Sequence, residues 1–174
     1  MRDIKSRTMQ FDHKRYSKNL LDTARKPRSI NFEAYAAEGN RFINDVAFQL
    51  RVNRNSAARI TRAVLHAVRD RLPPIDAVQF AQGLPMALKA IFIDQYEISK
   101  VPVKIRSSQK FLDYIYSKGG MTAETDFPDM ESVVEALQAV FFVLERHMSF
   151  GQVQQIKMIM GAGVQELLES ENTY

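Results

Sequence analysis

The sequence predicts an all-α protein of two pseudo-symmetric helical units, each of about four helices, packed into one bundle-like domain. Three observations lead to this prediction. Apolar residues recur at helical intervals along most of the chain, prolines and glycines fall between these segments, and the same order of segments occurs twice. The 174 residues are enough for one ordinary domain, and 45% hydrophobic and 25% charged residues are typical of a globular protein.

Residues 30–93 form the first predicted unit. Its predicted segments are a helix from a cap at Asn31 to Leu50, a turn and N-cap at 53–56, and helices over 57–72, 75–82 and from Pro85. Pro73 and Pro74 end the second of these helices, because a proline disfavours helical geometry at the residue before it.

An extended linker is predicted over residues 94–107, where Val101, Val103 and Ile105 alternate with polar residues and Pro102. This period of two is compatible at most with an edge strand. Residues 108–174 form the second unit. Its predicted segments are a helix ended by Gly119-Gly120, a polar loop to Pro128, a helix over 130–146 capped by Asp129, and helices over 149–160, with Ser149 and Gln152 as a capping box, and over 162–170.

An internal repeat connects the two units. Aligning Val64 with Val140 also places Val68 on Leu144 and Leu88 on Val164, with no gap between them. The preceding helices align separately, with Phe42 on Phe111 and Val46 on Ile115. Apolar residues therefore fall on apolar residues in the same order, which indicates duplication of one helical unit. Each unit alone is too small to bury an adequate core, so we expect the two to pack together.

Charge is distributed unevenly along the chain, although the net charge is only +4. Residues 1–29 contain nine Lys and Arg against three Asp, and residues 30–106 contain eleven against seven Asp and Glu. Residues 107–174 contain four against ten. Residues 1–29 are therefore interpreted as a basic N-terminal arm, either a partly ordered tail or a segment that docks on an anionic partner.

Composition excludes several classes of chemistry. Without cysteine the chain has no disulfide, thiolate nucleophile or Cys-ligated metal. The histidines His13, His66 and His147 lack ligand spacing, and no nucleophile has an identifiable base. We therefore predict no metal, no cofactor and no catalytic residue. No apolar run is long enough for a membrane span, no signal peptide is recognisable, and a cytoplasmic location is expected.

The candidate binding surface is a basic helix face. Arg59, Arg62, His66 and Arg69 share one side of a helix, and Arg51 and Arg54 lie just before it. Such a face either binds phosphates or another partner, or is an ordinary solvated surface. The equivalent positions in the second unit are Glu135, Gln138, Phe142 and Glu145. The two faces are predicted to attract each other within or between chains, and Phe142 is a candidate interface residue.

Residues 71–85 read Arg-Leu-Pro-Pro-Ile-Asp-Ala-Val-Gln-Phe-Ala-Gln-Gly-Leu-Pro, and a helix containing Leu88, Lys89 and Ile91 follows. This stretch resembles the R-L-P-P and Q-x-L-P signature of the bacterial domain-of-unknown-function family 2267. The resemblance covers about residues 32–171. It departs in the second unit, where Met160-Gly161 replaces Leu-Pro and Arg146-His147-Met148 replaces the Arg-Leu-Pro turn. It implies a duplicated, helical, soluble bacterial protein, and no catalytic residues, because the family has no established activity.

Two functions follow from these patterns as hypotheses. The first is a non-catalytic protein-interaction or structural module that binds a protein partner or associates with itself. The alternative is a polyanion- or nucleic-acid-binding protein that uses the basic arm and the arginine-rich helix face. No glycine-rich loop or aromatic platform accompanies the arginines, so recognition of bases is not predicted.

Overall fold

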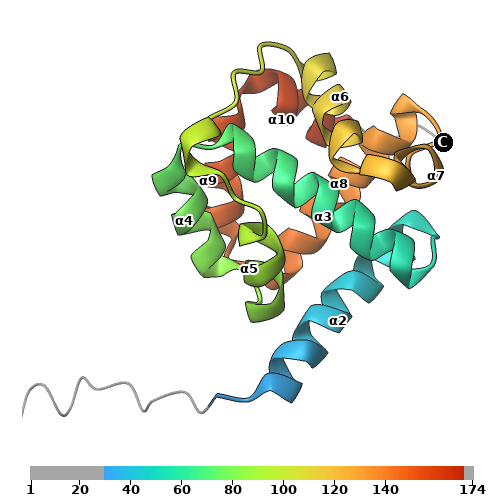
Figure 1. The fold of residues 1–174 in the computed structure, drawn as a ribbon, viewed down its shortest axis with the longest axis vertical. Coiled ribbons are helices and arrows are strands. Elements are labelled where there is room, and N and C mark those ends of the chain that lie inside the picture. The colour runs from blue at the N-terminus through green and yellow to red at the C-terminus, as the bar shows by residue number, and fades with distance from the viewer. Residues whose placement is uncertain (1–29, 171–174) are drawn as a thin grey trace, which may run out of the picture. The chain divides into compact units, whose positions relative to one another are not determined.

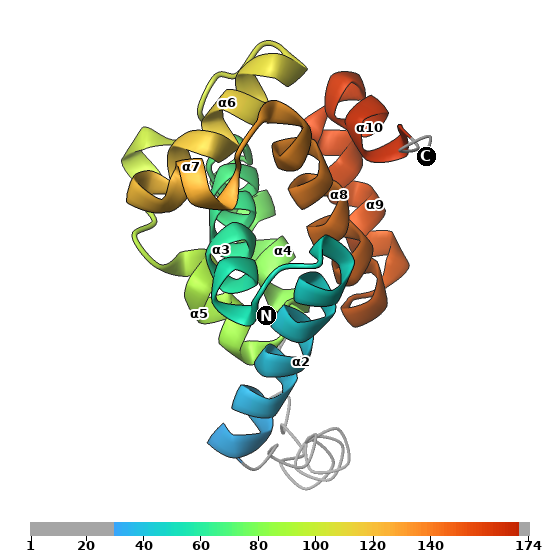
Figure 2. The same ribbon diagram turned by 90° about the vertical axis from the view of Figure 1, so that its right-hand side faces the viewer.

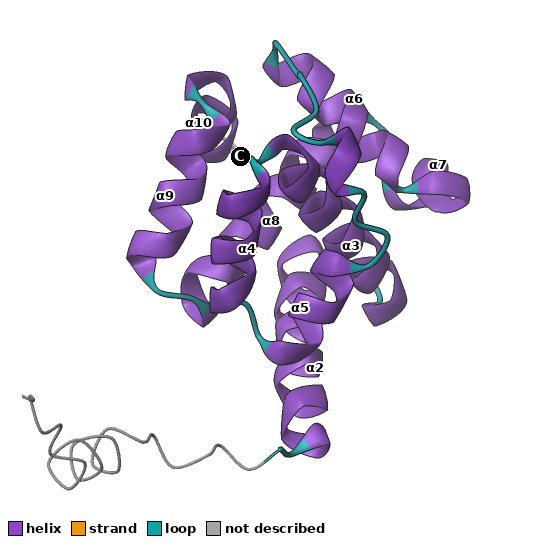
Figure 3. Ribbon diagram, turned by 60° about the vertical axis from the view of Figure 1, so that its left-hand side comes forward, coloured by secondary structure: helices purple, strands orange, loops and turns teal. Residues whose placement is uncertain are grey.

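The computed structural model describes residues 30–170, and this part of the chain is all-helical, as the sequence predicts (Figures 1 and 3). The predicted basic arm, residues 1–29, lies outside the described residues. Nine α-helices and no β-strand occur between residues 30 and 170. The helices are α2 (Phe32–Leu50), α3 (Arg54–Arg71), α4 (Pro74–Gly83), α5 (Met86–Ile93), α6 (Ser108–Lys118), α7 (Ala123–Asp126), α8 (Met130–His147), α9 (Phe150–Met160) and α10 (Ala162–Glu169).

The helices α3 and α8 form the centre of the hydrophobic core. α3 packs against α2, α5, α6 and α8, whereas α8 packs against α2, α6, α9 and α10. Every residue from 63 to 70 of α3 is buried. Amphipathic helices normally leave one side in water. α3 has no such side over these two turns, because neighbouring elements cover it all round.

The helix starts are set by side chains that accept backbone hydrogen bonds. Asn53 Oδ1 accepts from Ser56 N at 3.0 Å, so α3 begins at Arg54 rather than at residue 57 as predicted. Asp129 forms a reciprocal capping box with Ser132, which confirms the predicted cap of α8. The capping box predicted at Ser149 is wrong. Its hydroxyl donates to Gln152 Oε1 at 2.8 Å and caps no backbone N–H group.

Two connections differ in detail from the prediction. The polar loop predicted before Pro128 contains the short helix α7, because Ala123 and Phe127 are apolar enough to be buried there. The linker after α5 contains a 3-10 turn, Ile98–Lys100, and no strand among its described residues. Val103 N donates to Asp70 O at 2.7 Å, so the linker is fastened to the end of α3.

α2 crosses α5 at a very small separation. A Cβ atom on Gly39 would lie 2.6 Å from Ala87 Cβ, which is closer than two carbon atoms can approach. Where α6 crosses α10, the glycine belongs to the later helix of the pair: Gly163 of α10 faces Ser108 of α6. A Cβ atom on Gly163 would make an ordinary contact at 3.6 Å.

We therefore expect Gly39→Ala to lower the free energy of unfolding by about 1 to 3 kcal/mol, because the added methyl group forces the helices apart. Gly163→Ala is the matched control. It should be neutral or stabilising by up to about 1 kcal/mol, because alanine favours the helix. Urea denaturation measures both, and Gly39→Ala combined with Ala87→Gly should recover most of the loss. A fully stable Gly39→Ala variant would disprove the close crossing.

Candidate docking groove

The six residues of the predicted basic face do not share one solvent-exposed surface. The structure divides them into a buried pair, His66 and Arg69, a carboxylate-paired pair, Arg59 and Arg62, and an exposed pair, Arg51 and Arg54. Helical spacing correctly places four of them on one side of α3. The other elements that pack on that side, α5, α7 and the linker after α5, determine which of them reach water.

His66 is buried and held by the backbone of α5. Its Nε2 lies 2.7 Å from Ile91 O, so Nε2 carries the proton and donates. Burial is the main reason that the pKa of His66 falls to about 4, and the charges of Arg69 and Arg62 lower it further. The hydrogen bond to Ile91 acts in the opposite direction. His66 is therefore a neutral core residue near pH 7.

Arg69 belongs to a buried ionic cluster that sequence patterns did not reveal. The Arg69 side chain is 2% exposed, and Arg69 Nε donates to Asp70 Oδ1 at 2.8 Å. The other oxygen of Asp70 accepts from Tyr114 at 3.0 Å and from Lys118 at 2.6 Å. Burial raises the pKa of Asp70, but the hydrogen bonds and charges of Arg69 and Lys118 outweigh it and hold the pKa below its ordinary value. The cluster joins α3 to α6.

Arg69 also fixes the end of α5. Its Nη1 donates to Phe92 O and to Asp94 O, both at 2.7 Å, and its guanidinium lies over the ring of Tyr96. Three kinds of partner therefore surround a charge that faces no solvent. The only signal in the sequence is an Asp next to an Arg on a helix that carries apolar residues on several sides.

Arg59 and Arg62 are paired with acidic residues outside α3. Arg59 binds both carboxylate oxygens of Asp126, at 2.7 and 2.6 Å, and this contact ties α7 to α3. Burial raises the pKa of Asp126, but hydrogen bonds led by Arg59 and the charge of Arg59 hold it below its ordinary value. Arg62 lies 3.2 Å from Asp94 in an exposed pair. Such an exposed pair adds little to stability.

The predicted attraction between the α3 and α8 faces does not occur within residues 30–170. The acidic partners of Arg59, Arg62 and Arg69 are Asp126, Asp94 and Asp70, none of which lies on α8. On α8, Glu145 is paired with Lys157 of α9 at 2.5 Å. The ion pairs of the α3 stripe and of Glu145 are therefore made with other elements and not between α3 and α8.

Arg51 and Arg54 remain exposed in the turn between α2 and α3. Arg54 donates to Asn40 Oδ1, and no carboxylate among residues 30–170 pairs with Arg51 or Arg54. Arg51 has φ 53°, in the left-handed region that costs a side-chain-bearing residue about 1 to 2 kcal/mol. The backbone there closes α2 with Val52 N donating to Ala47 O, a motif in which glycine is usual.

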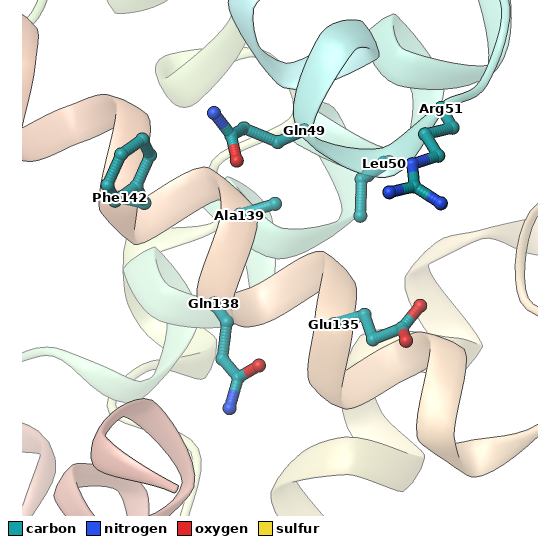
Figure 4. A pocket seen from close by; sticks show the side chains of 7 residues that line it. All are labelled: Gln49, Leu50, Arg51, Glu135, Gln138, Ala139 and Phe142. Atoms are coloured by element: carbon teal, nitrogen blue, oxygen red, sulfur yellow. The ribbon is translucent and has the colours of Figure 1, made fainter. Parts of the chain in front are cut away.

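A groove of about 450 Å³ lies beside Arg51, between the end of α2 and the middle of α8 (Figure 4). Its walls are formed by Gln49, Leu50, Arg51, Glu135, Gln138, Ala139 and Phe142. Figure 4 shows Phe142 and Gln49 at one end and Arg51 and Glu135 at the other. The groove therefore combines two side chains of opposite charge, amide groups and one aromatic ring.

Phe142 provides the apolar end of this groove. Its ring is 48% exposed and lies 5.9 Å from the guanidinium carbon of Arg146, as in a cation–π contact. Gln138 points away from α2, and its amide donates to Leu167 O and Ser170 O at the end of α10. Among the predicted candidates, only Arg51 and Phe142 line the groove.

Residues 39–167 match the family described as uncharacterised conserved proteins, DUF2267. This range includes the 71–85 stretch. The chain belongs to the DUF2267 family. No curated protein matches the chain significantly. The family description names no activity.

The arginine of the 71–85 stretch has a structural role in this DUF2267 protein. Arg71 Nη2 donates to Met160 O at 2.7 Å, and the guanidinium lies over the ring of Phe111. Burial lowers the pKa of Arg71. Arg71 thus connects the end of α3 to the turn between α9 and α10. Arg71 follows Val64 and Val68 at helical spacing on α3, so the sequence itself places it on the side of these buried residues.

Two further properties concern residues 30–170 of the DUF2267 chain. No group of three or more His, Cys, Asp or Glu side chains in this range is arranged to hold a metal ion. None of the helices in the same range is both long and apolar enough to cross a membrane.

Proposed function

We propose that this DUF2267 protein is a non-catalytic interaction module built from two related helical units. Its docking site is the groove between α2 and α8, with Arg51 and Phe142 as the principal contacts. The partner is a protein segment that carries a carboxylate for Arg51 and an apolar side chain for Phe142. The observation that carries the proposal is the left-handed backbone of Arg51 at the edge of this groove.

The helix boundaries support the two-unit origin. The offset that places Val64 on Val140, when added to the first and last residues of α3, gives those of α8. The same offset added to the first and last residues of α5 gives those of α10. Helix packing follows the same relation, because α2 packs on α5 and on α8, whereas α6 packs on α10 and on α3 (Figure 2). The crossings at Gly39 and at Gly163 correspond in the same way. Two copies of one unit, related by a pseudo-two-fold axis, account for all of these pairs.

The equivalent of Arg51 in the second unit supports a binding role for the arginine. The alignment that places Val46 on Ile115 also places Arg51 on Gly120, which has φ 58°. Both units therefore use the same left-handed conformation after the helix, but only one uses the residue suited to it. Residues held in a strained backbone conformation cluster at binding and active sites, so an arginine at a position suited to glycine supports a functional role. Arg51 directs its charge toward the groove (Figure 4).

The exposure of Phe142 supports the same site. The equivalent residue on α3 is His66, which is buried and bonded to the backbone of α5. On α8 the corresponding side is open and forms the groove. Exposed aromatic and arginine side chains at the edge of a concavity are the residue types that dominate binding energy in protein interfaces.

A peptide library tests this proposal and requires no identified partner. Random peptides displayed on phage are selected against the immobilised full-length protein, and selected peptides are then titrated against variants by calorimetry. Phe142→Ala and Arg51→Gly should each weaken binding by at least about tenfold, as expected for hot-spot residues. Arg51→Gly should keep the fold or stabilise it by up to about 1 kcal/mol, because glycine relieves the left-handed strain.

Phe48→Ala is the control, because Phe48 is 81% exposed on α2 but does not line the groove. It should change the affinity of the selected peptides by less than about twofold. The proposal fails if the library yields no binder. It also fails if the selected peptides bind Phe142→Ala and Arg51→Gly as tightly as they bind the unchanged protein.

A further inference from the structure

We infer that a second surface, distinct from the α2–α8 groove, joins two copies of this chain through the first turns of α2. Phe32 of each copy inserts into an apolar groove of the other, and Glu33 of each copy faces Arg54 of the other. Four properties of the described residues carry this inference: a groove, an aromatic side chain next to it, their arrangement along one helix, and the charges at the rim.

The apolar groove has a volume of about 570 Å³ and lies between α2, α3 and α5. Its lining includes Ala36, Gly39 and Ile43 of α2, Ala58 of α3, and Ala87 and Ile91 of α5. Gly39 and Ala87 meet where α2 crosses α5, and small side chains predominate along the lining of the groove. Arg54 and Asn40 lie at its rim and form a hydrogen bond with each other.

Phe32 is the matching projection. It is 75% exposed and stands one turn before Ala36 on the same side of α2. Its ring contacts the edge of Tyr35, with 6.2 Å between the ring centroids. Figures 1 and 2 show the first turns of α2 extending beyond the other described helices, so within residues 30–170 the apolar side of α2 continues past the groove with no other helix over it.

This arrangement is self-complementary. The projection and the groove lie on one stripe of α2, in the order Phe32, Ala36, Ile43. If two copies pack with their α2 helices antiparallel about a two-fold axis near residue 37, Phe32 of one copy faces Ile43 of the other. The same contact then occurs a second time by symmetry, which closes the assembly at two copies. The small side chains near residue 37 let the helices approach closely.

The charges at the rim agree with a second copy as the occupant. In the antiparallel arrangement, Glu33 of one copy lies on the side of α2 that carries Asn40, and therefore beside Arg54 of the other copy. No ion pair joins Glu33 or Arg54 to another residue in the range 30–170. Two complementary ion pairs thus form only in the dimer, and they favour this register over the parallel one.

Sedimentation equilibrium of the full-length protein measures the dimer directly, over a concentration range from about 1 to 500 µM. The unchanged protein should be dimeric at the upper end. Phe32→Asp should weaken the dimer by at least about tenfold, because it places a charge in the apolar groove. Phe48→Asp, on the other side of α2, is the control and should leave the dimer intact. Circular dichroism checks that each variant is folded.

A charge exchange tests the register. Glu33→Arg and Arg54→Glu should each weaken the dimer several-fold, and the two substitutions combined should restore it. A protein that is monomeric throughout the range would overturn the inference, because the groove would then serve another occupant. A dimer that survives Phe32→Asp, or a double variant no stronger than either single variant, would overturn it as well. Variants of Phe142 and Arg51 should leave the dimer unchanged, so this interface and the proposed docking groove can fail separately.

Discussion

Asp70→Ala is expected to lower the free energy of unfolding by about 3 to 5 kcal/mol, the loss typical of a broken buried ion pair. Arg69 would then keep its charge in the interior with only two carbonyl oxygens and the Tyr96 ring as partners. Lys118 and Tyr114 would lose their carboxylate at the same time. Urea denaturation near pH 7 measures the loss.

Asp113→Ala serves as the control for Asp70→Ala. Asp113 is exposed on α6, and within residues 30–170 it accepts only from Gln109, so its loss should change stability by less than about 0.5 kcal/mol. If Asp70→Ala costs no more than the control, the cluster does not hold α3 to α6. The pH dependence gives a second readout. Because the pKa of Asp70 is lowered in the folded state, its stabilisation is present above its ordinary pKa and is lost as pH falls through the lowered value.

His66 should make the protein sensitive to mild acid. Its pKa falls from 6.5 to about 4 on folding, so the unfolded chain binds a proton between these values and the folded chain does not. Stability is therefore fully present above pH 6.5 and declines as pH falls toward 4. One pKa unit corresponds to about 1.4 kcal/mol, so the decline reaches on the order of 3 kcal/mol.

His66→Gln isolates this effect. Glutamine has an N–H donor for Ile91 O but does not titrate, so the variant should lack the part of the acid-induced loss that belongs to His66. Urea denaturation of both proteins at several pH values from about 4 to 7.5 gives the difference. Parallel curves for the two proteins would show that His66 is not the acid-sensitive group.

Local sequence patterns were sufficient for the helical class and for most helix boundaries. Apolar spacing, the Asp129 cap and the prolines before α4 and α5 act over a few residues, so they are visible without the fold. The same locality explains the errors. The start of α3 depended on which residue of the 53–56 turn caps it. The helix α7 is too short for its periodicity to stand out, and its burial comes from contacts with distant residues.

The predicted face of α3 shows where sequence reasoning stops. Helical spacing establishes that Arg59, Arg62, His66 and Arg69 share one side of a helix. It does not establish whether that side meets water. α5, α7 and the linker cover it, and the partners Asp126, Asp94 and Ile91 lie 25 to 67 residues away along the chain. The exposed arginines beside this face, Arg51 and Arg54, could not be separated from the buried residues by pattern alone.

The sequence by itself determined that this chain is helical and that it belongs among the DUF2267 proteins. Only the tertiary structure decided that the α3 stripe is interior and that grooves lie beside Arg51 and Phe32. The physical reason is the distance along the chain over which each kind of interaction acts. Backbone hydrogen bonds and caps are set by near neighbours, whereas burial, ion pairing and pKa are set by side chains that folding brings together from distant positions.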